Sequence, residues 1–329
     1  KKKIILDIFI LLILGALSSL SLPPFNFFLI NFFTFSGFFI FLYKKLGIQS
    51  KKRIFFIYGW LFGFGYFLTN IYWITISLTF DQNFNFLIPF VLIIIPAFLA
   101  LFYGVITLIF YILNFKNLIS AFFLFSLLFG LIEYIRGNIL SGFPWNLIVY
   151  SFSENIKFLS FISVVGTYSF NLIVISFFTV PAIYILRRSN KEIIVIILLL
   201  LLPIFLFSYN ALYKKNFLNQ KLEENPYLIR VIGSNISLDR FYENTDTENV
   251  INELINLSSP DPEKKIFFLW PEGIIPDTYQ DQLNLYGDLF KNNFTTDHLI
   301  GLGITSRLSI EDQYKYLNSF SVFNNNLDL

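Results

Sequence analysis

Apolar stretches of membrane-spanning length fill the first two thirds of this chain and make it a helical membrane protein. A hydrocarbon core of about 30 Å needs about 20 helical residues, which these stretches supply within the usual range. A large soluble protein with buried core helices would not carry seven such stretches in succession with almost no charge. The predicted spans are residues 4–22, 25–43, 54–80, 86–113, 118–135, 158–186 and 193–212.

Composition agrees with this class of protein. Hydrophobic residues make up 55% of the 329 residues, phenylalanine occurs 44 times, and the mean hydropathy is +0.64. These values are typical of integral membrane proteins. The chain has no cysteine, so disulfides and thiolate metal sites are excluded within it. No pattern indicates a metal, a cofactor or nucleic-acid binding.

The charges predict the orientation in the membrane. The amino terminus and the second, fourth and sixth connections carry twelve Lys or Arg residues, whereas the alternate connections carry only Arg136 and Lys157. Positive charge marks the cytoplasmic side, so we expect a cytoplasmic amino terminus and, after seven crossings, an extracytoplasmic carboxyl part. The first stretch could also be a signal peptide after its three lysines. Its tail SSLSLPPF lacks a clear cleavage site, so we expect a retained helix.

Residues 213–329 are predicted to form a separate α/β domain after the helical domain of residues 1–212. Residues 1–212 carry a net charge of +9 and residues 213–329 a net charge of −7. The order of strands and helices predicts a layered sheet with right-handed crossovers, whose reactive groups lie at the carboxyl ends of the strands. The predicted strands are 228–236, 265–270, 298–306 and 316–324, and the predicted helices are 243–257 and 279–290.

The segment FFLWPEGIIP places a single carboxylate, Glu272, just beyond the second of these strands. Pro271 ends strand pairing because it has no backbone donor, and Gly273 permits a turn that the acid itself could not make. We expect Trp270 to support the carboxylate from behind. A general base needs a carboxylate in such a position. The alternative is an acid that only caps the following turn.

Other candidate residues lie near predicted helix and strand ends. Glu133 and Arg136 share a helix face and could form an ion pair, with Arg136 contacting a lipid phosphate. The alternative is an interfacial anchor pair. In GFPW, Trp145 could lie at headgroup level or be a plain interfacial aromatic residue. Asn235, at a strand end, could orient the site or satisfy a turn.

Four segments in order resemble the apolipoprotein N-acyltransferases, bacterial membrane enzymes that complete lipoprotein maturation. They are GWLFGFGYFLTNIYWI, EYIRGNILSGFPWNLIVYS, GSNI and FFLWPEGIIP. The resemblance covers essentially the whole chain. It implies a multi-span bundle in the bacterial inner membrane followed by a nitrilase-like αββα domain on the extracytoplasmic side. It also implies transfer of a fatty acyl group from a phospholipid to the amino terminus of a diacylated apolipoprotein, through an enzyme thioester and without a cofactor.

The resemblance assigns roles to individual residues. Glu272 matches the family's catalytic glutamate, with Trp270, Pro271 and Gly273 as its structural surroundings. Arg136, Trp145, Asn235 and Tyr242 are candidates for substrate or lipid binding, although the family has a tryptophan where Tyr242 falls. The family's lysine and cysteine have no match, so we expect a piece of the enzyme that is inactive by itself. The alternative is a non-catalytic membrane protein, either a degenerate lipid-binding relative or a transporter-like bundle.

Overall fold

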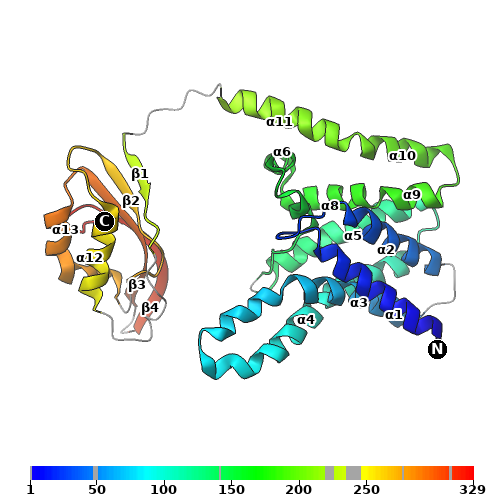
Figure 1. Ribbon diagram of the computed structural model, residues 1–329, viewed down its shortest axis with the longest axis horizontal. Helices are drawn as coiled ribbons and strands as arrows, with labels where there is room; N and C mark the ends of the chain where they lie inside the picture. The colour runs from blue at the N-terminus through cyan, green and yellow to red at the C-terminus, as the bar shows by residue number, and fades with distance from the viewer. Residues whose placement is uncertain are drawn as a thin grey trace. The chain divides into compact units, whose positions relative to one another are not determined.

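The computed structural model of the protein divides into two compact units, residues 1–220 and 221–329 (Figure 1). The predicted boundary at residue 212 lies inside a helix that continues to Leu218. The described residues are 2–46, 51–140, 142–218, 226–234, 246–275, 278–310 and 313–329.

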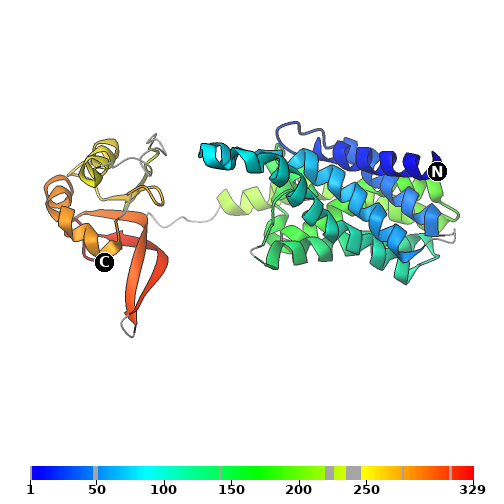
Figure 2. The ribbon, with the colours of Figure 1, turned by 90° about the horizontal axis from the view of Figure 1, so that it is seen from below.

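The first unit is a helical bundle (Figures 1 and 2). Its described elements are α1 (Lys2–Ser19), α2 (Ile30–Leu46), α3 (Lys52–Asn70), η1 (Tyr72–Thr79), η2 (Gln82–Leu87), α4 (Ile88–Leu113), α5 (Leu118–Asn138), η3 (Ile148–Phe152), α6 (Ile156–Leu159), α7 (Ile162–Val165), α8 (Thr167–Phe178), α9 (Val180–Leu186), α10 (Asn190–Leu200) and α11 (Leu202–Leu218).

Four helical segments among the described residues are long and apolar enough to cross a membrane. They are Gln82–Leu113, Leu118–Asn138, Thr167–Leu186 and Asn190–Lys215, and the bent pair α3–η1 makes a fifth if it is one span. The apolar helices Ile4–Ser19 and Ile156–Val165 are shorter. The helical membrane protein is thus confirmed, while the number of seven spans stays a prediction.

The third and sixth predicted spans are bent or interrupted. The sixth is divided among α6 to α9, with Gly166 at a φ of 79° before α8 and a proline at the start of α9. The third bends by 46° between α3 and η1. The first turn of a helix accommodates a proline, and α9 and α11 each carry one as their second residue. The longer helix α4 also contains a proline, Pro96, in its interior.

Aromatic side chains and glycines determine how the bundle packs. Phe38 of α2 stacks on Phe62 of α3 with ring centroids 4.1 Å apart. Gly59 and Gly63 of α3 have the four-residue spacing that allows two membrane helices to approach closely. A Cβ atom on Gly59 would lie 2.1 Å from the carbonyl oxygen of Tyr103 in α4. This close approach makes α3 and α4 one of the most extensive helix contacts of the unit.

The second unit is a four-stranded mixed sheet with helices on one face (Figure 1). The strands follow in the order β1-β2-β3-β4; β1–β2 and β2–β3 are parallel and β3–β4 is antiparallel. The β3–β4 hairpin, orange to red, extends beyond the helices (Figure 2). The described elements are β1 (Leu228–Val231), α12 (Thr247–Ser258), β2 (Ile266–Leu269), η5 (Gln280–Tyr286), α13 (Gly287–Asn293), β3 (His298–Ile310) and β4 (Gln313–Phe323).

The predicted strands and helices of this unit are present with shifted ends. The first strand is shorter than predicted, the third is longer, and the second helix begins as a 3-10 turn. Alternate strand residues, such as Phe268 and Ile300, are buried beneath α12 and α13. On the other face Ile229, Val231 and Phe320 are more than half exposed. The described sheet is thus covered on one face only.

Candidate active site

Glu272 follows β2, and the backbone on both sides of it stays paired with β3. The Trp270 N–H donates to the Gly301 carbonyl at 2.8 Å, and the Gly273 N–H donates to the Gly303 carbonyl at 3.1 Å. Because β2 and β3 are parallel, this is the carboxyl end of the sheet, where ligands of α/β proteins bind. Local pairing therefore fixes the backbone of the candidate base.

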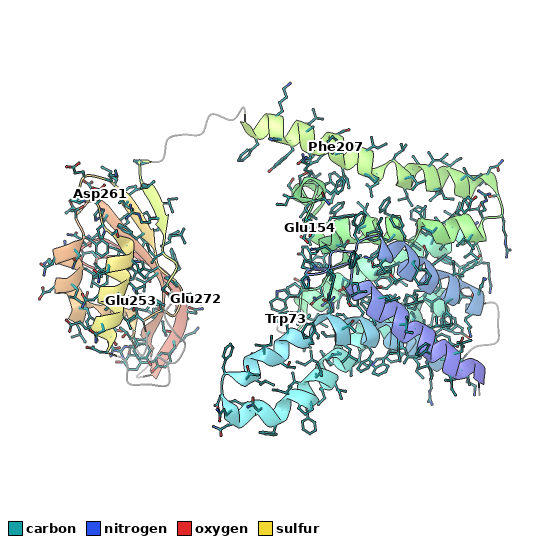
Figure 3. All side chains as sticks on the ribbon, in the orientation of Figure 1. Trp73, Glu154, Phe207, Glu253, Asp261 and Glu272 are labelled. Carbon is teal, nitrogen blue, oxygen red and sulfur yellow. The ribbon has the colours of Figure 1, made fainter. Side chains whose placement is uncertain are left out.

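The residues next to Glu272 shape the corner on which it lies. The expectation that Pro271 ends strand pairing is wrong, because pairing with β3 resumes at Gly273; Pro271, which has no N–H, only interrupts it. Gly273 has a φ of 60°, in the left-handed region that favours glycine. The Trp270 indole is buried in the core, and its Nε1–H donates to Ser258 Oγ of α12 at 2.9 Å. Trp270 thus fixes the strand end from the helix-covered core, and the Glu272 side chain remains exposed (Figure 3).

Two residues that sequence reasoning missed complete this corner. Asn318 of β4 donates from Nδ2 to Glu272 Oε1 at 2.7 Å. Gly303 of β3 lies under the acid, since a Cβ atom there would be 2.8 Å from Glu272 Cγ. Phe320, opposite Gly303 in the β3–β4 register, is 62% exposed beside them. The alternating glycines of GLG, residues 301–303, were the available signal, because they leave one strand face bare.

This arrangement suits a proton acceptor. The carboxylate is exposed, one oxygen accepts an amide hydrogen bond, and a shallow pocket lined by Gly303, Asn318 and Phe320 adjoins it. Within the described ranges, no group of three or more His, Cys, Asp or Glu residues is arranged to hold a metal ion. The site can orient a carboxylate for proton transfer at an open, partly apolar surface.

Arg136 lies in the other unit, at the end of α5, and is buried there. It forms an ion pair with Glu133, whose second oxygen accepts a hydrogen bond from Tyr103 Oη at 2.7 Å. Its Nη1 donates to the Phe143 carbonyl at 2.6 Å and its Nη2 to the Trp145 carbonyl at 3.0 Å. With 2% exposure, Arg136 fixes the loop that follows α5. Contact with a lipid phosphate stays a prediction.

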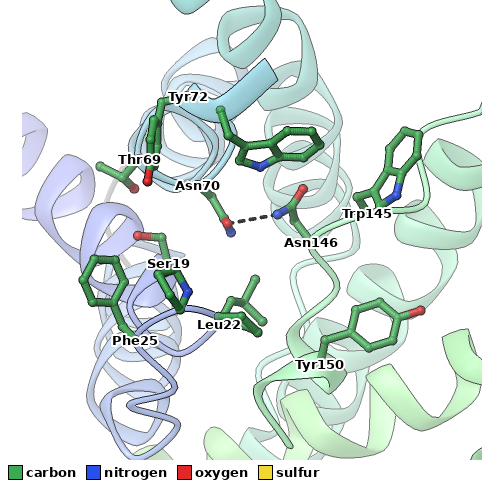
Figure 4. Close-up of a pocket in the computed structure, with 12 residues that line it drawn as sticks. Ser19, Leu22, Phe25, Thr69, Asn70, Tyr72, Trp145, Asn146 and Tyr150 are labelled. Carbon is green, nitrogen blue, oxygen red and sulfur yellow. Dashed lines mark hydrogen bonds between the residues drawn. The ribbon is translucent and has the colours of Figure 1, made fainter. Parts of the chain in front are cut away.

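The loop held by Arg136 forms one wall of a cavity of about 270 Å³ (Figure 4). Trp145 is 54% exposed at its rim. Inside, Asn146 Nδ2 donates to Asn70 Oδ1 at 2.9 Å, while Asn70 Nδ2 and Asn146 Oδ1 have no hydrogen-bond partner among the described residues. The remaining lining is mostly aromatic or prolyl, as in Tyr72 and Phe25. The cavity thus combines an amide pair with apolar walls.

The candidate residues fall into separate groups. Arg136 and Trp145 lie together in the first unit, and Glu272 belongs to the second. Asn235 and Tyr242 lie outside the described residues. Their predicted roles stay predictions.

Comparison with known proteins decides the family. Residues 14–180, half of the chain, match the family described as the apolipoprotein N-acyltransferase N-terminal domain. The chain belongs to the apolipoprotein N-acyltransferase family. The match covers the cavity wall, Arg136 and Trp145, and the resemblance found in the sequence is confirmed. The apolar helices and this family mark the chain as a bacterial membrane protein.

Individual relatives extend the similarity into the second unit. An apolipoprotein N-acyltransferase of Rhizobium leguminosarum bv. trifolii is 28% identical over 85% of this chain and 55% of its own length. The Rickettsia prowazekii protein of the same name is 30% identical over 96% of this chain and 62% of its own length. The Rickettsia typhi protein is 38% identical over 50% of this chain and 32% of its own length. The chain spans about half the length of the first of these apolipoprotein N-acyltransferases.

Proposed function

We propose that this chain is part of an apolipoprotein N-acyltransferase that moves a fatty acyl group from a phospholipid to the amino terminus of an S-diacylglyceryl lipoprotein. The observation that carries the proposal is the family match across the bundle, followed in the same chain by Glu272 at a strand end of an α/β unit. The donor is a lipid and the acceptor is anchored by a lipid, so a membrane bundle joined to a reactive carboxylate suits them.

The reaction divides into two acyl transfers. A thiolate attacks the phospholipid ester carbonyl and forms a thioester, and the lysophospholipid leaves. The lipoprotein amine then attacks the thioester carbonyl, and the thiol is released. In the first transfer Glu272 takes the proton from the attacking thiol and gives it to the leaving lysophospholipid oxygen. In the second it takes the proton from the amine and gives it to the leaving thiolate, with Asn318 orienting its carboxylate throughout. The chain has no cysteine, so the thiol has to come from outside these 329 residues.

The bundle is proposed to hold the lipid part of a substrate. The cavity beside Trp145 offers apolar walls for acyl chains and the Asn70–Asn146 amides for ester or headgroup oxygens. Arg136 serves this cavity by holding its loop wall, with Trp145 at headgroup depth. Asn235 and Tyr242 remain candidates for contacts with the acceptor.

We also propose the finer architecture that the resemblance implies. Seven helices cross the bacterial inner membrane with a cytoplasmic amino terminus, and the α/β unit is nitrilase-like and extracytoplasmic. The uneven distribution of Lys and Arg supports this orientation. The parallel strands with one covering helix layer are compatible with half of an αββα sandwich.

The test uses the complete gene product that carries this chain, in bacteria depleted of their own apolipoprotein N-acyltransferase. Mass spectrometry of a lipoprotein amino terminus should show N-acylation. In Glu272→Gln, acyl transfer should fall at least about a hundredfold, because a general base contributes 10²–10⁴ in rate. Glu253→Gln, which removes an exposed acid of α12, is the matched control.

The two failures are distinguishable. If the wild-type gene product never N-acylates the lipoprotein, the proposed acyltransferase function is wrong, and the alternative of a non-catalytic membrane protein is correct. If Glu272→Gln retains full activity at normal membrane levels, the enzyme stands and Glu272 has no part in its chemistry.

A further inference from the structure

A groove with two basic residues at its rim lies at the end of the bundle opposite the Trp145 cavity. It has a volume of about 480 Å³ and lies between α3 and α4. Lys52 and Arg53, at the start of α3, form the rim, and Phe56, Ile57 and Leu108 form the wall. Both basic side chains are exposed. The groove therefore joins positive charge directly to an apolar surface.

Most of the positive charge at this end has no ion-pair partner among the described residues. The segment YKKLGIQSKKR contains five basic residues and no acid. Among the described residues of this end, Asp7 forms an ion pair with Lys45. None of the ion pairs found among the described residues involves Lys52 or Arg53. Two cations are thus available to an external anion.

The groove lies at the level in the bilayer where lipid headgroups are found. The helix α3 has 19 residues, and at about 1.5 Å per residue it is about 28 Å long. This length matches a hydrocarbon core of about 30 Å, so Lys52 lies at one headgroup level when Asn70 lies near the other. Ile57, 48% exposed and one turn further along α3, then faces acyl chains.

We infer that this groove binds an anionic phospholipid of the bilayer, such as cardiolipin or phosphatidylglycerol. Arg53 and Lys52 bind the phosphate, because guanidinium and ammonium groups pair with phosphate oxygens at short range. The first methylenes of an acyl chain lie along Phe56, Ile57 and Leu108. Basic pockets between membrane helices bind such headgroups on the cytoplasmic side. The site is separate from acyl transfer and does not depend on the proposed function.

The experiment measures lipid binding to the full chain in detergent by native mass spectrometry. Cardiolipin and phosphatidylglycerol should bind, and phosphatidylethanolamine and phosphatidylcholine should bind much more weakly. The variant Lys52→Gln/Arg53→Gln should bind cardiolipin about thirtyfold more weakly, at about 1 kcal/mol for each basic residue near the surface. Free glycerol phosphate should not compete, because the apolar wall contributes to binding.

Two further variants distinguish a specific lipid-binding site from general electrostatic attraction between basic residues and anionic lipids. Arg188→Gln/Lys191→Gln removes the same charge from another exposed site, at the start of α10, and should leave cardiolipin binding unchanged. Leu108→Trp fills the groove while keeping both cations and should weaken binding. The inference is overturned if both charge variants lose cardiolipin equally, if neither loses it, or if Leu108→Trp binds as the wild type does.

Discussion

The carboxylate of Glu272 accepts a hydrogen bond from the side-chain amide of Asn318, 46 residues away in sequence. Gly303 makes this contact possible, since a larger residue would displace the acid. A hydrogen bond to a charged group contributes about 1.5–3 kcal/mol. At the scale of a single residue, the orientation of the proposed base therefore depends on a strand that the sequence places far from it.

We predict that Asn318→Ala slows acyl transfer by the complete gene product about tenfold to a hundredfold, with little effect on its level in the membrane. Asn318→Asp places a second carboxylate at hydrogen-bond distance, and like charges disfavour each other's ionisation. The pH–rate profile of the Asn318→Asp variant should therefore be shifted to higher pH than that of the wild type. Initial rates against pH with a diacylated lipopeptide measure both effects.

The control is Ser319→Ala, because Ser319 bonds to Ser306 rather than to Glu272. A positioning role for Asn318 is wrong if Asn318→Asp has the wild-type pH profile.

Glu272 itself could be predicted from the sequence, because proline and glycine mark its corner locally. Asn318 could not, because only the β3–β4 register brings it to the acid.

At the scale of the elements, α3 is the helix around which the first half of the bundle packs. It contacts α1 on one side and α4 on the other, and these are among the most extensive helix contacts of the unit. Gly59 brings its backbone against the Tyr103 carbonyl of α4. Since lipid tails are as apolar as the side chains, close packing of this kind stabilises membrane helices.

We predict that Gly59→Ala destabilises the bundle by about 1–3 kcal/mol, because the added methyl group would overlap backbone that cannot move aside. Thermal unfolding of the full chain in detergent, followed by tryptophan fluorescence, should show a lower midpoint. The control is Gly37→Ala, whose new methyl group meets only the flexible Leu14 side chain at 3.3 Å. Equal midpoints for the two variants would contradict this packing role.

The sequence predicted where apolar helices occur but not how they break. Apolar character and length identify a span. A bend such as that after Asn70 depends instead on which neighbouring groups form hydrogen bonds with the backbone N–H and C=O groups that lose their helical partners. In the second unit, likewise, the observed ends of strands and helices differ from those predicted from the sequence. The predicted 279–290 helix begins as η5, whose Asp281 is bound by Arg307 of β3. That contact lowers the pKa of Asp281 and holds the turn against the sheet.

At the scale of the whole chain, the two parts differ in charge as well as in fold. Residues 1–212 have a net charge of +9, with their Lys and Arg residues concentrated in alternate connections, and residues 213–329 have a net charge of −7. An acidic unit without an apolar span is free to lie on either side of a membrane, so the connections of the bundle decide its side. The proposed chemistry needs the outer side, where Glu272 can reach lipoprotein substrates.

The absence of cysteine allows this orientation to be tested without altering a native thiol. Glu253→Cys places a single exposed thiol on α12, and Lys191→Cys places one in the first turn of α10. With a membrane-impermeant maleimide on intact spheroplasts, Glu253→Cys should be labelled and Lys191→Cys should not; after permeabilisation both should be labelled. Labelling of Lys191→Cys alone in intact cells would place Glu272 in the cytosol. The carboxylate would then be separated by the bilayer from the lipoproteins on which the proposed enzyme acts.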